Sequence, residues 1–373
     1  MEAEVTDPGS DGSGGSPLTA LLVIAWAMTL SSFVGAAIWV LLTGDPGYAN
    51  GASPKVTMSL NSFHVADPLP NESATVDSEP PVSDAPAAGS AKTPAPGGET
   101  QLAAAGLHPH PDPLLIEKSD LGLLPIVGKD GRLPWRVYAR PFNSVDSRPR
   151  IAVIVTGLGV SENATKSALD SLPGPVTLSF APFTKNLPDW IDKSRAAGHE
   201  VMIDLPLEPT DYPRNDPGPN TLLTSVPIDQ NLRRLGWILS RATGYVGVSI
   251  YMGSGMVAKP RVLSPILAEI KTRGLMLVDT REDPMAPATD LAKELKLAVA
   301  VSDALIDREL AAGPIDRQLA ELESRARAQG AALAVARPFP LTLNRLKTWT
   351  ASLNAKGIAL APVSALPAMQ TKQ

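Results

Sequence analysis

The stretch IAVIVTGLGV, residues 151–160, decides the fold of this chain. An apolar run rich in β-branched residues leads into a glycine turn, as is typical of a strand buried on both faces. Similar runs recur at 176–180, 200–204, 245–249, 275–279, 297–301, 332–336 and 358–362. Helical patterns that end at a glycine lie between several of them, at 186–198, 261–274 and 315–330. This alternation predicts an α/β fold, a (β/α)7–8 barrel, with a doubly wound open sheet as the alternative.

The residues before the barrel have a different composition. No charged residue occurs between 17 and 42, so we expect a cytoplasmic tail at 1–16 and one transmembrane helix at 17–43. A cleaved signal peptide is the alternative, although the run is long and no basic residue precedes it. Residues 44–113 are rich in Pro, Ala and Ser, which predicts a disordered linker. Residues 114–150 are expected to be a semi-ordered entry segment that packs on a domain at 151–368.

Composition excludes two kinds of function. The formal net charge of −5 gives no electrostatic basis for binding nucleic acid, and the absence of cysteine excludes disulfides and thiolate metal sites. Three of the four histidines, His64, His108 and His110, lie in or beside the linker, and His199 precedes its strand. HPHPDP (108–113) could hold a metal loosely, but incidental linker residues are the simpler interpretation. We therefore expect no histidine ligands where the strands end.

Ligands bind at the carboxyl ends of the strands in parallel α/β folds. Polar residues there give Asp204 and Asp279 as candidate catalytic residues, and as candidate substrate-binding residues Tyr251, Arg337, Glu208 and Thr156. A structural role is the alternative for each. Arg337 could bind an anionic group or neutralise Asp204 or Asp279. No cofactor is expected; the alternative is a divalent cation on Asp204, Asp279 and Asp307.

Two other site types fit poorly. The TGLGVSE stretch has the first two glycines of a dinucleotide-binding loop, but Glu162 replaces the third. Ser254 in MGSGM lacks the spacing of a nucleophile elbow, and no histidine is placed to act as its base. The glycines after the first strand are therefore expected to serve the geometry of the turn.

Several motifs, in this order, carry a family resemblance: IAVIVTGLG, LPGPVTLSFAPF, AAGHEVMIDLPLEP, DPGPNTLLTS, GYVGVSIYMGSGM, RGLMLVDT, and ARPFPLTL with APVSAL. Over residues 151–366 the chain resembles the divergent polysaccharide deacetylase family, a branch of the chitooligosaccharide-deacetylase-like barrels. The resemblance implies one amino-terminal anchor in the bacterial inner membrane, by the helix at 17–43, and a periplasmic barrel. It also implies an envelope glycan, such as peptidoglycan or another polysaccharide, as partner.

The chain departs from the pattern of this family at the positions that carry chemistry. Thr156 and Gly157 stand where the family commonly has paired aspartates, and Asp204 stands where a histidine is common. Ser249, Ile250 and Tyr251 replace Asn-Asn-His, and Ala336, Arg337 and Pro338 replace Gly-His-Pro. Asp279 and Asp307 match acidic positions that remain.

These replacements lead to three hypotheses about function. The first is a membrane-anchored periplasmic protein that binds or acts on envelope carbohydrate with a degenerate metal site. The second is an active N-deacetylase-type hydrolase with an all-carboxylate metal site. The third is a non-enzymatic scaffold of the envelope.

Overall fold

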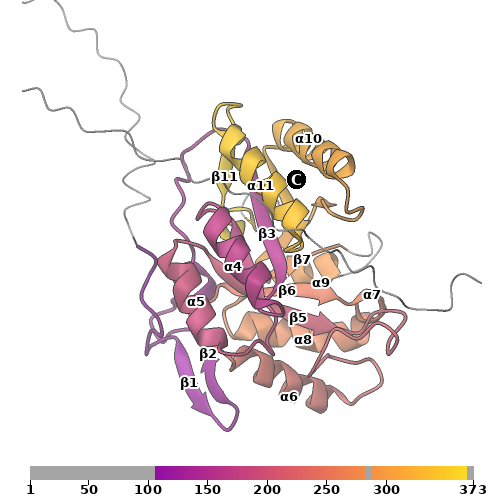
Figure 1. Ribbon diagram of the computed structural model, residues 1–373. Helices are drawn as coiled ribbons and strands as arrows, with labels where there is room; N and C mark the ends of the chain where they lie inside the picture. Colours follow the sequence, from indigo (N-terminus) through magenta and orange to yellow (C-terminus); the bar gives the residue numbers. More distant parts are fainter. Residues whose placement is uncertain (1–105, 282–287, 368–373) are drawn as a thin grey trace, which may run out of the picture. The chain divides into compact units, whose positions relative to one another are not determined.

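A computed structural model describes residues 106–281 and 288–367 (Figure 1). The chain divides into two compact units, Met1–Gly89 and Ser90–Gln373, and all described residues belong to the second. The predicted tail 1–16, the predicted transmembrane helix 17–43 and most of the predicted linker 44–113 lie outside the described residues. None of the helices within 106–281 and 288–367 combines the length and the apolar character needed to span a bilayer.

A parallel sheet of nine strands forms the centre of the domain. Neighbouring strands follow the order β8-β7-β6-β5-β4-β3-β10-β9, and β11 pairs with β3 beside this path. The strands are β3 (Arg150–Leu158), β4 (Thr177–Phe180), β5 (Val201–Leu207), β6 (Gly247–Met252), β7 (Met276–Asp279), β8 (Val299–Val301), β9 (Ala304–Leu305), β10 (Ala331–Ala336) and β11 (Ala359–Ala361). Each of the eight predicted apolar runs overlaps one of these strands, and β9 was not predicted.

The sheet curls so that its two ends meet. Strands β8 and β9 stand at opposite ends of the strand order, yet only Ser302 and Asp303 separate them along the chain. The backbone N–H of Ser302 donates to the Asp279 carbonyl of β7 (2.9 Å), and that of Asp303 donates to the Leu333 carbonyl of β10 (2.8 Å). One short segment therefore joins β7 to β10. The alternative of a doubly wound open sheet is wrong, because the strand order returns on itself instead of reversing at a switch point.

Alternate residues of β3 explain why the strands read as continuous apolar runs. Ile151, Val153 and Val155 belong to a cluster that includes the helices, whereas Ala152 and Ile154 belong to a second cluster with interior residues of other strands. Both faces are thus removed from water. The covering helices, seen around the sheet in Figure 1, are α4 (Glu162–Ser171), α5 (Leu187–Ala196), α6 (Ile228–Leu239), α8 (Pro260–Thr272), α9 (Ala288–Glu294), α10 (Ala312–Gln329) and α11 (Pro340–Leu353), with the short α7 (Ser254–Val257) after β6.

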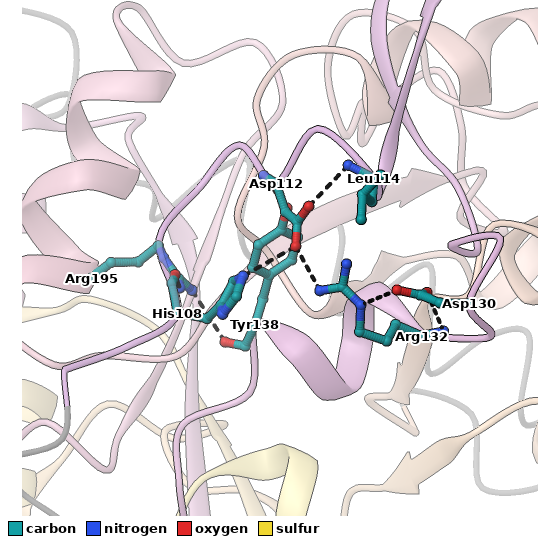
Figure 2. Close-up of polar contacts among 7 residues, drawn as sticks. All are labelled: His108, Asp112, Leu114, Asp130, Arg132, Tyr138 and Arg195. Atoms are coloured by element: carbon teal, nitrogen blue, oxygen red, sulfur yellow. Dashed lines mark hydrogen bonds and ion pairs between the residues drawn. The ribbon is translucent and has the colours of Figure 1, made fainter.

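The segment that leads into the barrel, residues 114–150, contains regular secondary structure. It forms the antiparallel hairpin β1 (Ile116–Ser119) and β2 (Gly122–Pro125), and the short helix α3 (Pro134–Val137). Asp112 holds it together by accepting from Arg132 (2.7 Å) and donating its backbone N–H to the Tyr138 hydroxyl (3.0 Å) (Figure 2).

Arg195 of α5 fixes this segment to the barrel. Its guanidinium donates to the carbonyls of Tyr138 (3.1 Å), Gly244 (2.7 Å) and His108 (2.6 Å), two of which appear in Figure 2. Burial lowers the pKa of Arg195 to about 10. His110 lies 3.1 Å from Asp192, a residue of α5. Part of the predicted linker, residues 106–113, therefore lies against the barrel, because a buried cation needs these carbonyls.

Candidate functional site

A buried carboxyl group lies where four strands come together. Asp204 of β5 is only 1% exposed. Its Oδ2 accepts from the backbone N–H of Gly157 in β3 (2.8 Å). Its Oδ1 accepts from two hydroxyls, Ser179 Oγ of β4 (2.5 Å) and Ser249 Oγ of β6 (2.9 Å). We call Asp204, Gly157, Ser179 and Ser249 the Asp204 cluster.

The position of Asp204 differs from the prediction. The sequence placed it at the carboxyl end of its strand, whereas β5 continues through Leu207 and pairs with β6 as far as Met252. Met202, two residues earlier, belongs to the interior cluster, and side chains two apart on a strand share a face. Asp204 therefore projects into the barrel rather than into an open groove.

Burial raises the pKa of Asp204 from 3.8 to about 6, although the hydrogen bonds from Ser179, Gly157 and Ser249 favour the charged form. The desolvation of the carboxylate is the larger effect. A carboxyl that titrates near pH 6 changes its charge close to neutrality, which is the range that suits a general acid or base.

The end of β3 borders this cluster. Gly157 and Gly159 both have left-handed backbones, with φ of 77° and 87°. Gly159 therefore serves the turn after β3, as expected, whereas Gly157 lies within β3, where the register with β4 shifts. A side-chain carbon on Gly157 would lie 3.7 Å from the ring of Tyr251, so the half-buried Tyr251 sits next to the Asp204 cluster. Thr156 is 4% exposed, and its hydroxyl donates to the Ala336 carbonyl of β10 (3.4 Å).

Arg337 is bound to an aspartate other than the two considered from the sequence. Its backbone N–H and Nε donate to the carboxylate of Asp307 at 2.8 and 3.1 Å, and the Thr342 hydroxyl donates to the same carboxylate (3.1 Å). Asp307 is fully buried, whereas the Arg337 side chain is 39% exposed. The guanidinium also lies 5.0 Å from the centre of the Phe339 ring. Arg337 therefore neutralises Asp307, and part of its cation still reaches solvent.

The other two candidate acids hold loops in place. Asp279 accepts from the backbone N–H of Arg281 (3.0 Å) and from the Thr289 hydroxyl (2.6 Å), so it connects the end of β7 to the start of α9. Glu208 accepts from the hydroxyl of Thr224 (2.9 Å) across the long loop between β5 and α6. These contacts give both carboxylates a structural role in holding neighbouring loops.

The residues present do not fit a zinc-type site. Within 106–281 and 288–367, no three side chains among His, Cys, Asp and Glu gather closely enough to hold a metal ion. Asp204, Asp279 and Asp307 each bind different donors, so the all-carboxylate alternative finds no support in this part of the chain. His199 lies at the amino end of β5, as predicted, with Nδ1 2.8 Å from the Val176 carbonyl, and burial lowers its pKa.

Ser179, which supplies one hydroxyl to Asp204, was not predicted as a site residue. Its signal was one of two hydroxyl residues, Thr177 and Ser179, within the apolar run at 176–180. Glu200 was missed as well: this fully buried carboxylate accepts from Thr177 (3.2 Å) and from the backbone N–H of Ser364 (3.1 Å). It lies at the amino end of the strands, so its role is to bind the carboxyl-terminal segment to the barrel.

Known proteins place the chain in a family. The profile of the divergent polysaccharide deacetylase family matches residues 153–367. The crystal structure of the uncharacterized protein ATU2773 from Agrobacterium tumefaciens C58 is 36% identical with a TM-score of 0.64, over 66% of this chain and 99% of that one. An uncharacterized Haemophilus influenzae protein is 20% identical over 203 residues, 54% of this chain and 70% of the relative. YibQ of Escherichia coli K12, also uncharacterized, is 21% identical over 198 residues, 53% of this chain and 61% of YibQ. Because the family profile matches more than half of the chain, the chain belongs to the divergent polysaccharide deacetylase family.

Proposed function

We propose that the domain binds an envelope glycan, such as peptidoglycan, at the carboxyl end of its barrel and has lost metal-dependent deacetylation. Membership of a polysaccharide deacetylase family supports the ligand class. The observation that carries the loss is the state of Asp204: both of its carboxylate oxygens accept hydrogen bonds from the protein itself. A carboxylate bound in this way is poorly placed to bind a cation as well.

Tyr251 and Arg337 would make the contacts with the glycan. Tyr251 lies beside the Asp204 cluster and combines an aromatic face with a hydroxyl, a pairing suited to sugar rings. The guanidinium of Arg337 is held by Asp307 on one side and is partly exposed on the other. It is therefore oriented to pair with an acidic group. Thr156 and Glu208 would act by positioning the surrounding backbone.

We also propose that a single helix at 17–43 anchors the protein in the inner membrane, with the barrel in the periplasm. The uncharged run at 17–42 supports the anchor. The linker that follows would let the domain reach tens of ångströms from the bilayer, since about 60 flexible residues span roughly 40 Å on average.

One observation favours the alternative of an active hydrolase. The pKa of Asp204, raised to about 6, suits acid–base work near neutral pH. Such an enzyme would need Asp204 to exchange its internal hydrogen bonds for contacts with a substrate or water.

The test uses the purified full chain with muropeptides and chitopentaose as probes. We expect binding to weaken about tenfold in Tyr251→Ala, the scale of one lost aromatic contact. Arg337→Gln should weaken only the binding of muropeptides, which carry carboxylates; Arg261→Gln, at an exposed arginine of α8, is the matched control.

Two further measurements separate the hypotheses. Metal analysis should find no stoichiometric ion, and acetate release from chitopentaose should be absent. Stoichiometric metal with acetate release abolished in Asp204→Asn would establish the hydrolase instead. If neither probe binds, the scaffold hypothesis replaces the glycan-binding one.

A further inference from the structure

A separate cavity with a basic lining opens on the flank of the barrel. Its volume is about 750 Å³, and it lies between α3, the end of α8, α9, β8 and the end of α10. Among the described residues that line it, six are cationic and one, Asp303, is acidic; the cations are Arg136, Lys271, Arg281, Lys293, Lys296 and Arg325. Tyr251, Arg337 and Asp204 are not among the lining residues, so this basic cavity is distinct from the site at the carboxyl end of the barrel.

The charge in the basic cavity runs against that of the whole chain. The chain has 33 basic and 38 acidic residues, whereas the part of the cavity lining that the structure describes has six basic residues and one acidic residue. Asp303 is already paired with Arg325 (3.2 Å). Among the residues that the structure describes, Lys271, Lys293 and Lys296 form no ion pair. Cations gathered around a concave surface repel one another, and an anionic ligand would relieve that repulsion.

An aromatic residue adds a second kind of contact. Trp135 lines the cavity and is half-buried, with the guanidinium of Arg136 5.0 Å from its ring centre. Leu133, Leu275 and Leu297 make part of the wall apolar. A sugar presents an apolar face of C–H groups that packs on an indole ring, while acidic substituents would meet the lysines. A volume of this size accommodates several sugar rings, since drug-sized ligands occupy about 300–1,000 Å³.

We propose that the basic cavity binds a segment of an acidic polysaccharide, with its carboxylates on the lysines and a sugar ring against Trp135. The choice of a glycan among possible polyanions rests on the proposed function. The existence of an anion-binding site rests only on the lining of the cavity. Either proposal can therefore fail without the other.

The test measures binding of hexagalacturonate, an acidic oligosaccharide, to the purified full chain by calorimetry at several salt concentrations. The test variant is the triple substitution Lys271→Gln, Lys293→Gln, Lys296→Gln, which retains unbranched side chains of good helix propensity. We expect affinity to fall about tenfold or more, because three exposed charge contacts of modest strength are lost together. The salt dependence of binding should fall in parallel.

A matched control changes the net charge equally elsewhere. Lys118→Gln, Lys166→Gln, Lys347→Gln removes three exposed lysines that do not line the cavity. We expect its affinity to stay within about twofold of the original protein, because exposed charges distant from the ligand are screened. Equal losses in both triple variants would reduce the effect to net charge and overturn the proposal.

Three other probes decide what the cavity recognises. Chitohexaose, which is uncharged, and hexaglutamate, which is charged but not a sugar, should each bind at least about tenfold more weakly than hexagalacturonate. Trp135→Ala should weaken hexagalacturonate binding and leave hexaglutamate binding unchanged. Trp135→Phe, which keeps an aromatic ring, should retain binding and controls for folding.

The proposal that the ligand is a glycan would be refuted if hexaglutamate or anionic lipid vesicles bound as tightly as hexagalacturonate. Hexagalacturonate binding lost in Tyr251→Ala but kept in the lysine triple variant would move the acidic glycan to the carboxyl end of the barrel.

Discussion

Replacing Asp204 with asparagine removes one titrating group from the interior of the barrel and keeps the shape of the side chain. In the folded chain the pKa of Asp204 is raised from 3.8 to about 6. Because the folded value lies above the unfolded one, this carboxyl stabilises the fold most below pH 3.8, in its protonated form. That stability is lost as the pH rises to about 6. The displacement is equivalent to about 3 kcal/mol of unfolding free energy.

The measurement compares urea unfolding of the original protein and Asp204→Asn at pH 4, 5, 6, 7 and 8. The asparagine carbonyl can accept from the Gly157 N–H, and its amide can donate to Ser179 and Ser249, so the variant should fold. The advantage of the original protein over Asp204→Asn should fall by about 2.4 kcal/mol between pH 4 and pH 7, because the unfolded carboxyl is already partly ionised at pH 4, and then stay constant. All other titrating groups, including Glu200, are present in both proteins and cancel in the difference.

A difference that does not change with pH would refute this reasoning, as would one that rises with pH. Asp204→Ala is the second variant. It leaves the Gly157 N–H and the two serine hydroxyls without their acceptor, so we expect it to lose about 3 kcal/mol or more relative to Asp204→Asn at every pH. If alanine and asparagine are equivalent, the hydrogen bonds to Asp204 contribute nothing to stability.

Four other substitutions, one of them a control, test separate parts of the fold. Gly159→Ala should cost about 2 kcal/mol, because its left-handed backbone and the side chain of Thr184 leave no room for a methyl group; Gly131→Ala, also left-handed but with no neighbour within 4 Å, should cost about 1 kcal/mol. Asp307→Ala should cost about 2 kcal/mol in urea unfolding by leaving a partly exposed guanidinium without its carboxylate. Arg195→Met should cost about 3 kcal/mol by releasing three carbonyls, and amide exchange at residues 107–112 should accelerate; unchanged exchange there would show that Arg195 does not hold the segment.

The strands were predictable because burial on both faces leaves a continuous apolar run in the sequence. The end of β5 was not. Asp204 and Pro206 are residue types that usually end a strand, yet Pro206 pairs with Tyr251 and Leu207 with Met252. The hydrogen bonds from Gly157, Ser179 and Ser249 satisfy the buried carboxyl and let the strand continue past it.

The pairings among the candidate residues could not be predicted from the sequence. Tyr251 lies near Asp204, as strand order suggests for β5 and β6. The pairing of Arg337 with Asp307 depends on how the sheet closes, since β9 and β10 become neighbours only in the folded barrel. The basic cavity could not be predicted from the sequence. Its cations come from α3, α8, α9 and α10 and from the loops beside α9, and these segments share no motif.

The closure of the barrel through Ser302 and Asp303 gives the ring a single seam. Strands β9 and β10 share two residue pairs, whereas every other neighbouring pair of strands in this sheet shares at least three, and β8 and β9 are joined only by the chain itself. Fewer ladder bonds mean a lower free energy for local opening. Local opening of the barrel should therefore begin at Ser302 and Asp303. Water would then reach the interior face of the strands through that opening. The barrel is thus closed at this point by the backbone hydrogen bonds of only two residues.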